Sequence, residues 1–164
     1  LRLAEEYRLR IVIMGGREAW LEAENIARAQ VPVVIDPSAN LPGNFDALKT
    51  RHDAVSILSR AGVRVAISTF STHNARKLRQ WAGNAVRSGL SPAIALQSVT
   101  SIPAEILGLS DRGIIRKGRI ADIVVWSGDP FELSSHAEHV IIGGRVMPRS
   151  HRQHALFERY RTLP

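Results

Sequence analysis

The sequence contains no cysteine, and this absence excludes several kinds of chemistry. Disulfide bonds, thiolate zinc sites, iron–sulfur clusters and a cysteine nucleophile are all ruled out. The sequence also lacks any apolar run near the ~20 residues that a membrane-spanning helix needs, so an integral membrane protein is excluded too. Neither absence separates a cytoplasmic from a periplasmic location, and both stay open.

Acidic residues are comparatively few: 15 Asp and Glu face 22 Lys and Arg, which gives a formal net charge of +7. This excess of positive charge suggests nucleic acid or an anionic substrate as a partner. However, 19 of the basic residues are Arg, scattered from Arg2 to Arg161 without a dense cluster before the last twenty positions. Scattered charge favours a solvated surface. A basic nucleic-acid-binding module is therefore the least favoured of the alternatives below.

The first half of the chain alternates short apolar runs with helical patterns. The runs are rich in β-branched residues and end at turn residues such as Gly15-Gly16 and Asp36-Pro37, which favours strands. Strands that are apolar on both faces and alternate with helices are typical of parallel βα units. The sequence predicts strands at 11–14, 31–36 and 63–69, followed by helices at 17–29, 45–61 and 74–89.

The second half begins with helices and then changes character. Ser91-Pro92 supplies an N-cap and a proline at the first helical position, and this predicts a helix to about Val99. From about residue 110, glycines surround a β-branched run, and Gly143-Gly144 predicts a two-residue hairpin turn. We therefore expect three parts: βα units at 1–109, a β-rich unit at 110–150 and a terminal helix at 151–164.

Residues 91–130, SPAIALQSVTSIPAEILGLSDRGIIRKGRIADIVVWSGDP, carry a family resemblance. This stretch resembles the C-terminal region of the amidohydrolase superfamily, in particular its imidazolonepropionase-like and Xaa-Pro-dipeptidase-like branch. The hairpin at 139–146, HVIIGGRV, continues the pattern, and upstream AGVRVAIST is similar to the last barrel strand of the same proteins. The resemblance implies an α/β fold that consists of the last three βα units of a TIM-like (β/α)8 barrel, followed by part of a small β-sandwich.

The same resemblance implies a metal-dependent hydrolase that cleaves carbon–nitrogen bonds of a small amide or cyclic amide with a metal-activated water. A divalent metal, most often zinc, is the cofactor of the full-length family. Two of the family's ligand positions fall in this chain, and both depart from the pattern. Met14 stands at the expected His position and Phe70 at the expected Asp position, and neither side chain is a fitting ligand. A small shift of the alignment would make His73 the ligand instead.

Three polar residues that follow the expected strands are candidates for substrate binding: Glu18, His73 and Asn74. Each also has a structural interpretation, and Asn74 in particular is a good helix N-cap. No metal is expected to bind this chain alone, and its catalytic residues cannot be assigned. An alternative function is a non-catalytic amidohydrolase-like scaffold or binding protein.

The chain starts at Leu1, inside an expected helix and without Met, so we expect it to be a piece of a longer protein. Three βα units leave a strand edge and helix faces that the other units of a barrel would cover. We therefore expect a homo-oligomer or a companion N-terminal segment, and no activity from this piece by itself.

Overall fold

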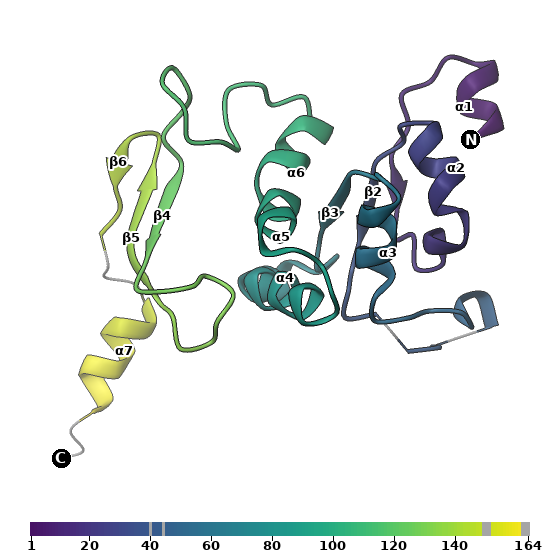
Figure 1. The fold of residues 1–164 in the computed structure, drawn as a ribbon. Coiled ribbons are helices and arrows are strands. Elements are labelled where there is room, and N and C mark those ends of the chain that lie inside the picture. Colours follow the sequence, from purple (N-terminus) through teal and green to yellow (C-terminus); the bar gives the residue numbers. More distant parts are fainter. Residues whose placement is uncertain (40, 44, 149–151, 162–164) are drawn as a thin grey trace.

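A computed structural model describes residues 1–39, 41–43, 45–148 and 152–161 (Figure 1). Two three-stranded sheets, one parallel and one antiparallel, organise the chain. In chain order the elements are α1 (Arg2–Glu6), β1 (Ile13–Met14), η1 (Ala19–Glu22), α2 (Ala23–Arg28), β2 (Val33–Ile35), η2 (Phe45–Ala47), α3 (Ala54–Arg60), β3 (Val65–Ile67), η3 (Thr72–Lys77), α4 (Leu78–Arg87), α5 (Pro92–Val99), α6 (Ser101–Ile106), β4 (Ile123–Trp126), β5 (Ala137–Ile142), β6 (Arg145–Val146) and α7 (Arg152–Tyr160), where η marks a 3₁₀ helix.

The first sheet confirms the predicted parallel strands, in the order β1-β2-β3. Ile13 is level with Val33, which is level with Val65, and these three side chains share one face of the sheet. That face belongs to the hydrophobic core, where Leu58 of α3 is fully buried. Helices therefore cover this face, and the β-branched side chains on it are buried between the helices and the sheet.

The predicted helix at 45–61 is wrong in its extent. A short 3₁₀ helix, η2, occupies only Phe45–Ala47, and the α-helix begins at Ala54. The reason lies in the backbone of Lys49, because its N–H donates to the Glu18 carboxylate (2.6 Å) and its C=O accepts from the Trp20 indole (2.9 Å). Because the Lys49 N–H and C=O bond to side chains about thirty residues upstream, they do not form the backbone hydrogen bonds that an α-helix needs at this position. The helices expected at 17–29 and 74–89 also open with 3₁₀ turns, η1 and η3.

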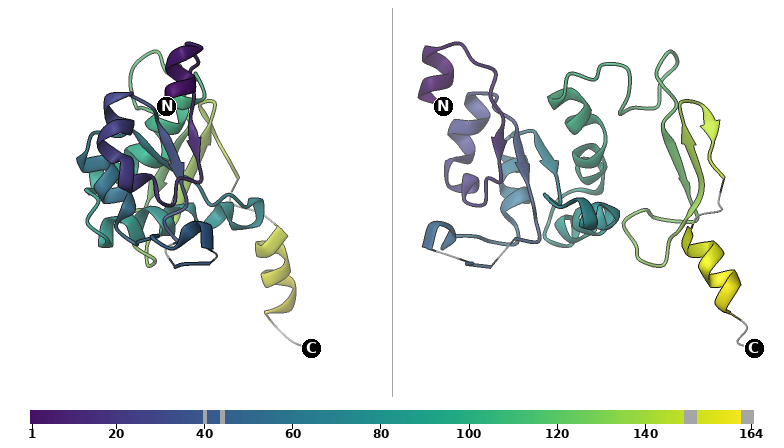
Figure 2. Two further views of the ribbon diagram at one scale, coloured as in Figure 1. Left: turned by 90° about the vertical axis from the view of Figure 1, so that its right-hand side faces the viewer. Right: turned by 180° about the vertical axis from the view of Figure 1, so that it is seen from behind.

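The second sheet is antiparallel, in the order β4-β5-β6, and it contains the predicted hairpin. Gly143 and Gly144 form its turn with φ of 56° and 79°, a backbone region that glycine enters without steric cost. The β-branched run that the glycines surround forms β4, which begins at Ile123. Beyond this sheet, both views of Figure 2 show α7 projecting away from the rest of the chain.

Helix α4 joins the two sheets through the loop that follows β4. The Arg79 guanidinium donates to the backbone oxygens of Pro130 (3.0 Å) and Glu132 (2.7 Å) and lies over the Trp126 ring, 5.1 Å from its centroid. Phe131 of this loop packs against the core of the parallel sheet. The division at residues 109 and 150 remains a prediction, but these contacts connect its first two parts.

None of the helices in the described ranges is long and apolar enough to span a membrane.

Candidate functional site

The carboxyl ends of the three parallel strands form the edge of the sheet that carries the candidate site. Ligands of parallel α/β sheets bind at this edge because the loops that follow the strands converge there. In this chain the edge comprises residues 14–18 after β1, residues 36–38 after β2, and residues 68–77 after β3. We call these three segments the C-terminal edge.

Met14 is the last residue of β1, and the residue is 64% exposed. Neighbouring residues of a strand point to opposite faces, so Met14 lies on the face opposite to Ile13 and the core. Its thioether is a poor ligand for zinc and for harder divalent ions. The structure therefore places an apolar, accessible group at the end of this strand.

Phe70 lies three residues beyond the end of β3 and is 48% exposed. Its φ of 47° is in the left-handed region, which is costly for a residue with a bulky side chain. Two local hydrogen bonds accompany this conformation: the Phe70 N–H donates to the Ser68 hydroxyl (3.1 Å), and the Thr69 hydroxyl donates to the Ser71 C=O (2.9 Å). A phenyl ring can neither bind a metal ion nor accept a proton.

His73 and Asn74 lie inside η3, whose N-cap is Ser71. The His73 ring is exposed and lies against the Ser71 hydroxyl, with 3.0 Å to Nδ1 and 3.2 Å to Nε2. The Asn74 N–H donates to the Ser71 C=O (3.1 Å), so the interpretation of Asn74 as the N-cap is wrong. The cap falls three residues earlier because a 3₁₀ turn precedes α4.

Glu18 is half-buried, and its carboxylate accepts the Lys49 N–H. Trp20 accompanies this contact, since its indole N–H donates to the Lys49 C=O and its ring lies 4.8 Å from the Arg51 guanidinium. Arg51 in turn pairs with Asp53, and this hydrogen-bonded pair lowers the pKa of the Asp53 carboxyl. The prediction that Glu18 binds substrate stays a prediction, but its carboxylate has a structural partner.

Asp36, another acidic residue at this edge, accepts hydrogen bonds within its own turn. Asp36 Oδ1 accepts both the backbone N–H of Ser38 (2.8 Å) and the Ser38 hydroxyl (2.6 Å). Across the described parts of the chain, no three His, Asp or Glu side chains gather into a group that could hold a metal ion. The described side chains of the C-terminal edge therefore do not form a metal centre by themselves.

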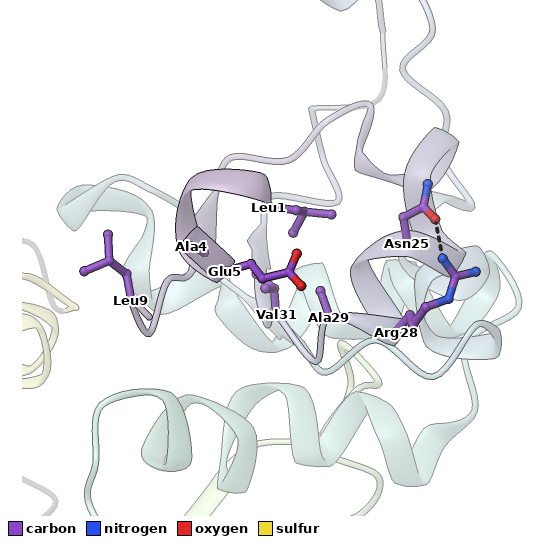
Figure 3. Close-up of a pocket in the computed structure, with 8 residues that line it drawn as sticks. All are labelled: Leu1, Ala4, Glu5, Leu9, Asn25, Arg28, Ala29 and Val31. Atoms are coloured by element: carbon purple, nitrogen blue, oxygen red, sulfur yellow. Dashed lines mark hydrogen bonds between the residues drawn. The ribbon is translucent and has the colours of Figure 1, made fainter. Parts of the chain in front are cut away.

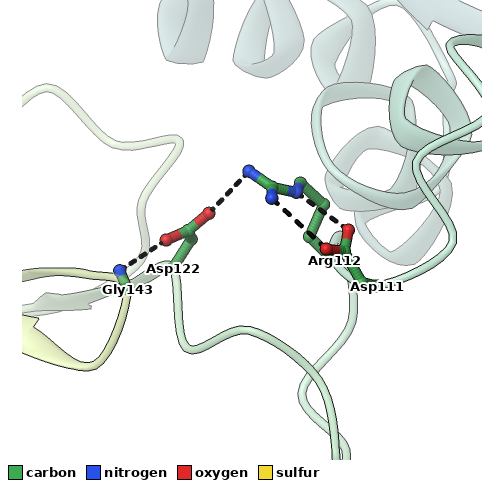
Figure 4. A network of polar contacts seen from close by, with 4 residues as sticks. All are labelled: Asp111, Arg112, Asp122 and Gly143. Carbon is green, nitrogen blue, oxygen red and sulfur yellow. Dashed lines mark hydrogen bonds and ion pairs between the residues drawn. The ribbon is translucent and has the colours of Figure 1, made fainter.

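A second polar group, which the sequence analysis did not single out, stabilises the loop before β4 (Figure 4). Arg112 donates to Asp111 through Nε (3.0 Å) and to Asp122 through Nη1 (3.4 Å), and Asp122 accepts the Gly143 N–H (2.8 Å). The hydrogen bond from Arg112 lowers the pKa of Asp111. These contacts fasten the hairpin turn to the loop, so Asp122, which lies within the stretch that carries the family resemblance, has a structural role.

A groove lies between α1 and the end of α2, away from the C-terminal edge (Figure 3). Its polar groups are few: Glu5 contributes a carboxylate, and the Arg28 guanidinium is bonded to the Asn25 side chain (2.9 Å). The other lining residues are apolar, namely Leu1, Ala4, Leu9, Ala29 and Val31. This lining offers no combination of nucleophile, base and metal ligand.

Comparison with known proteins identifies the family. The model of the amidohydrolase family matches residues 52–148. The imidazolonepropionase of Cereibacter sphaeroides is 34% identical over 122 residues, which are 70% of this chain and 30% of that protein. An amidohydrolase structure from Thermotoga maritima superposes with a TM-score of 0.82 at 32% identity, over 91% of this chain and 39% of its own.

A more distant structure, the zinc-complexed atrazine chlorohydrolase from Arthrobacter aurescens TC1, shares the fold at 18% identity with a TM-score of 0.59. The chain thus spans about a third of the length of the imidazolonepropionase and two fifths of the Thermotoga structure. The resemblance predicted from residues 91–130 is confirmed by a match that contains that whole stretch. The chain belongs to the amidohydrolase family.

Proposed function

We propose that this chain forms the last three βα units of a (β/α)8 barrel and part of the β-sandwich that follows it. The order β1-β2-β3, with every pair parallel, is the order that consecutive units of a barrel adopt. The antiparallel sheet follows in sequence, as expected for a sandwich built onto the barrel. The coverage of 39% of the Thermotoga chain supports a partial barrel of this size.

The whole protein would act on a carbon–nitrogen bond of a small amide or cyclic amide. Membership of the amidohydrolase family supports this class of reaction. The observation that carries the assignment for this chain is its C-terminal edge, where barrel enzymes place their chemistry. Met14 and Phe70 stand there without donating a ligand, so this piece contributes walls of the site and is inactive alone.

A non-catalytic binding protein is the second candidate, and the same two residues favour it. A barrel that keeps its shape but replaces a His and an Asp with Met14 and Phe70 loses the groups that would hold a metal and accept a proton. Such a protein would still bind a small molecule at the C-terminal edge. The two candidates differ in whether ligands contributed by the rest of the barrel suffice for hydrolysis.

A chimera tests the proposal. The part of the Thermotoga maritima amidohydrolase that precedes its matched region is joined to this chain, and zinc content is measured by mass spectrometry. We expect a folded chimera whose zinc content rises when Met14→His and Phe70→Asp are introduced together. A matched control places Met147→His and Phe157→Asp in the second half of the chain, where no rise is expected. An unchanged zinc content in the first pair would show that these positions are not ligand positions.

The outer edge of β1 is a candidate site for pairing with another polypeptide segment. Within the described residues β1 pairs only with β2, so one row of its backbone groups has no strand beside it. Such an edge is a template for pairing with another strand. We propose that a companion N-terminal segment or a second copy of the chain covers it. When no companion segment is present, the free edge should pair with a second copy, so sedimentation velocity of the isolated chain should show self-association. A sharp monomer that unfolds cooperatively would show that the edge needs no cover and would contradict both forms of the proposal.

A further inference from the structure

The turn between β3 and η3 places a serine hydroxyl beside a histidine ring at the C-terminal edge. Ser71 Oγ lies 3.0 Å from His73 Nδ1 and 3.2 Å from Nε2, so a ring nitrogen is within reach of the hydroxyl proton. His73 is exposed and Ser71 is half-buried, which leaves the pair open to small molecules. A hydroxyl within hydrogen-bond reach of an imidazole is the arrangement that activates a serine nucleophile.

The Ser71 hydroxyl is not used to cap the helix that it precedes. Ser71 is the N-cap of η3, a position where a serine hydroxyl ordinarily accepts a backbone N–H of the first helical turn. Among the described residues, this hydroxyl caps no such group and faces His73 instead. The Ser71 carbonyl oxygen holds the turn, because it accepts from the Thr69 hydroxyl (2.9 Å) and from the Asn74 N–H (3.1 Å). The backbone therefore stabilises the turn, and the side-chain oxygen stays available for chemistry.

The backbone directly before Ser71 is strained. Phe70 has a φ of 47°, a left-handed conformation that is costly for a bulky residue, and such strain gathers at functional sites. A sharp turn between a parallel strand and the next helix lifts a side chain above the edge of the sheet, and α/β hydrolases present a nucleophilic serine in this way. Ser71 follows a turn of this kind, between Ile67 at the end of β3 and the start of η3.

A second serine–histidine contact in the chain provides a comparison. Ser127 Oγ lies 3.1 Å from His136 Nδ1, but it also accepts the His136 N–H (3.0 Å). The Ser127 N–H donates to the His136 C=O (3.0 Å), so this pair joins the end of β4 to the start of β5. A hydroxyl oxygen that accepts a backbone N–H is a weaker nucleophile, because the bond withdraws electron density from the oxygen. Ser71 thus differs from Ser127 in its uncommitted hydroxyl oxygen.

We propose that Ser71 is a nucleophile that takes the acyl group of a small aryl ester, with His73 as its general base. His73 accepts the Ser71 hydroxyl proton while Oγ bonds to the acyl carbon. The bond from that carbon to the ester oxygen breaks, and the aryl oxide leaves with the electron pair. His73 then releases its proton to solvent. An aryl ester fits because an aryl oxide leaves without a proton donor. This single acylation needs no metal and goes beyond the metal-dependent hydrolysis proposed for the whole protein.

The test is acylation of the full chain by 4-nitrophenyl acetate at about pH 8, where an imidazole is ordinarily uncharged. Release of 4-nitrophenolate gives the rate, and mass spectrometry of acid-quenched peptides locates the acetyl group. We expect a burst of about one acetyl group per chain, on Ser71. Ser71→Ala should abolish this burst, and His73→Gln should slow it about hundredfold. The matched variants Ser127→Ala and His136→Gln should leave it unchanged.

Far-UV circular dichroism checks that each variant is folded. If Ser71→Ala does not fold, His73→Gln decides the test, because His73 is exposed. An absence of acetyl groups on Ser71, equal acetylation of Ser127, or an unchanged rate in His73→Gln would overturn the inference. Failure of the proposed function would appear separately, as an unchanged zinc content in the chimera, because the acylation involves no metal.

Discussion

Gly83 in the middle of α4 provides a sharp test of how the two halves of the chain fit together. A Cβ at this position would lie 2.8 Å from the backbone oxygen of Phe131 and 3.4 Å from its Cβ. No flexible side chain can move aside, because the closer contact is with backbone. The loop that carries Phe131 would have to leave the helix, which would endanger the two hydrogen bonds that Arg79 donates to it.

The two effects of Gly83→Ala oppose each other, and their magnitudes decide the outcome. Ala in place of Gly within a helix contributes about 0.8–1 kcal/mol of stability. Overpacking against a backbone costs about 1–3 kcal/mol, and a hydrogen bond from a charged donor contributes about 1.5–3 kcal/mol before solvent screening. Overpacking less the gain in helix propensity leaves a cost of about 0–2 kcal/mol, and weakening of one Arg79 hydrogen bond adds about 1 kcal/mol after solvent screening. We therefore expect the free energy of unfolding to fall by about 1–3 kcal/mol.

Urea unfolding followed by far-UV circular dichroism measures this change. Asn84→Ala is the matched control, because Asn84 is exposed on the same helix and its replacement should stabilise by about 0.5 kcal/mol. If Gly83→Ala stabilised the chain as helix propensity alone predicts, the loop would not pack on α4 as the structure shows, and the argument for a joined pair of sheets would fail.

Three further predictions concern contacts at single residues. Glu18→Ala should increase the rate of proteolysis in the segment around Lys49, and Glu18→Gln should restore most of the protection, because an amide oxygen can also accept the Lys49 N–H. Arg112→Ala should raise the pKa of Asp111, measured by NMR, towards its ordinary value of about 3.9. Because this pKa is lowered in the folded state, the pair stabilises the folded chain at pH values above about 3.9, and this contribution is lost as the pH falls through the folded-state pKa. Ser91→Ala should lower the free energy of unfolding by about 1 kcal/mol, because the Ser91 hydroxyl accepts the Ile94 N–H at the start of α5; no change in urea unfolding would contradict this cap.

Features with a local cause could be predicted from the sequence. Ser91-Pro92 begins α5 and Gly143-Gly144 forms a hairpin turn, because each depends on the backbone preferences of two neighbouring residues. The parallel strands were also predictable, since runs buried on both faces must alternate with covering helices.

Features that depend on distant partners could not be predicted. The chain from 48 to 53 has a helical pattern, yet Glu18 and Trp20 bind the backbone of Lys49 and end the helix there. Nothing in the spacing of residues 45–61 indicates partners about thirty positions upstream. In the candidate site, the family resemblance singled out Met14 and Phe70, but the left-handed backbone of Phe70 and the local hydrogen bonds of its neighbours became visible only in the structure.

The central claim is that the chain carries the C-terminal edge of an amidohydrolase barrel without metal ligands there. Equilibrium dialysis of the purified chain against zinc, with the bound metal counted per chain, tests this most directly. The account predicts no ion bound at a ratio of one per chain, since Met14 and Phe70 cannot coordinate it. One tightly bound zinc ion per chain, lost on His73→Ala, would contradict the claim and make His73 the ligand.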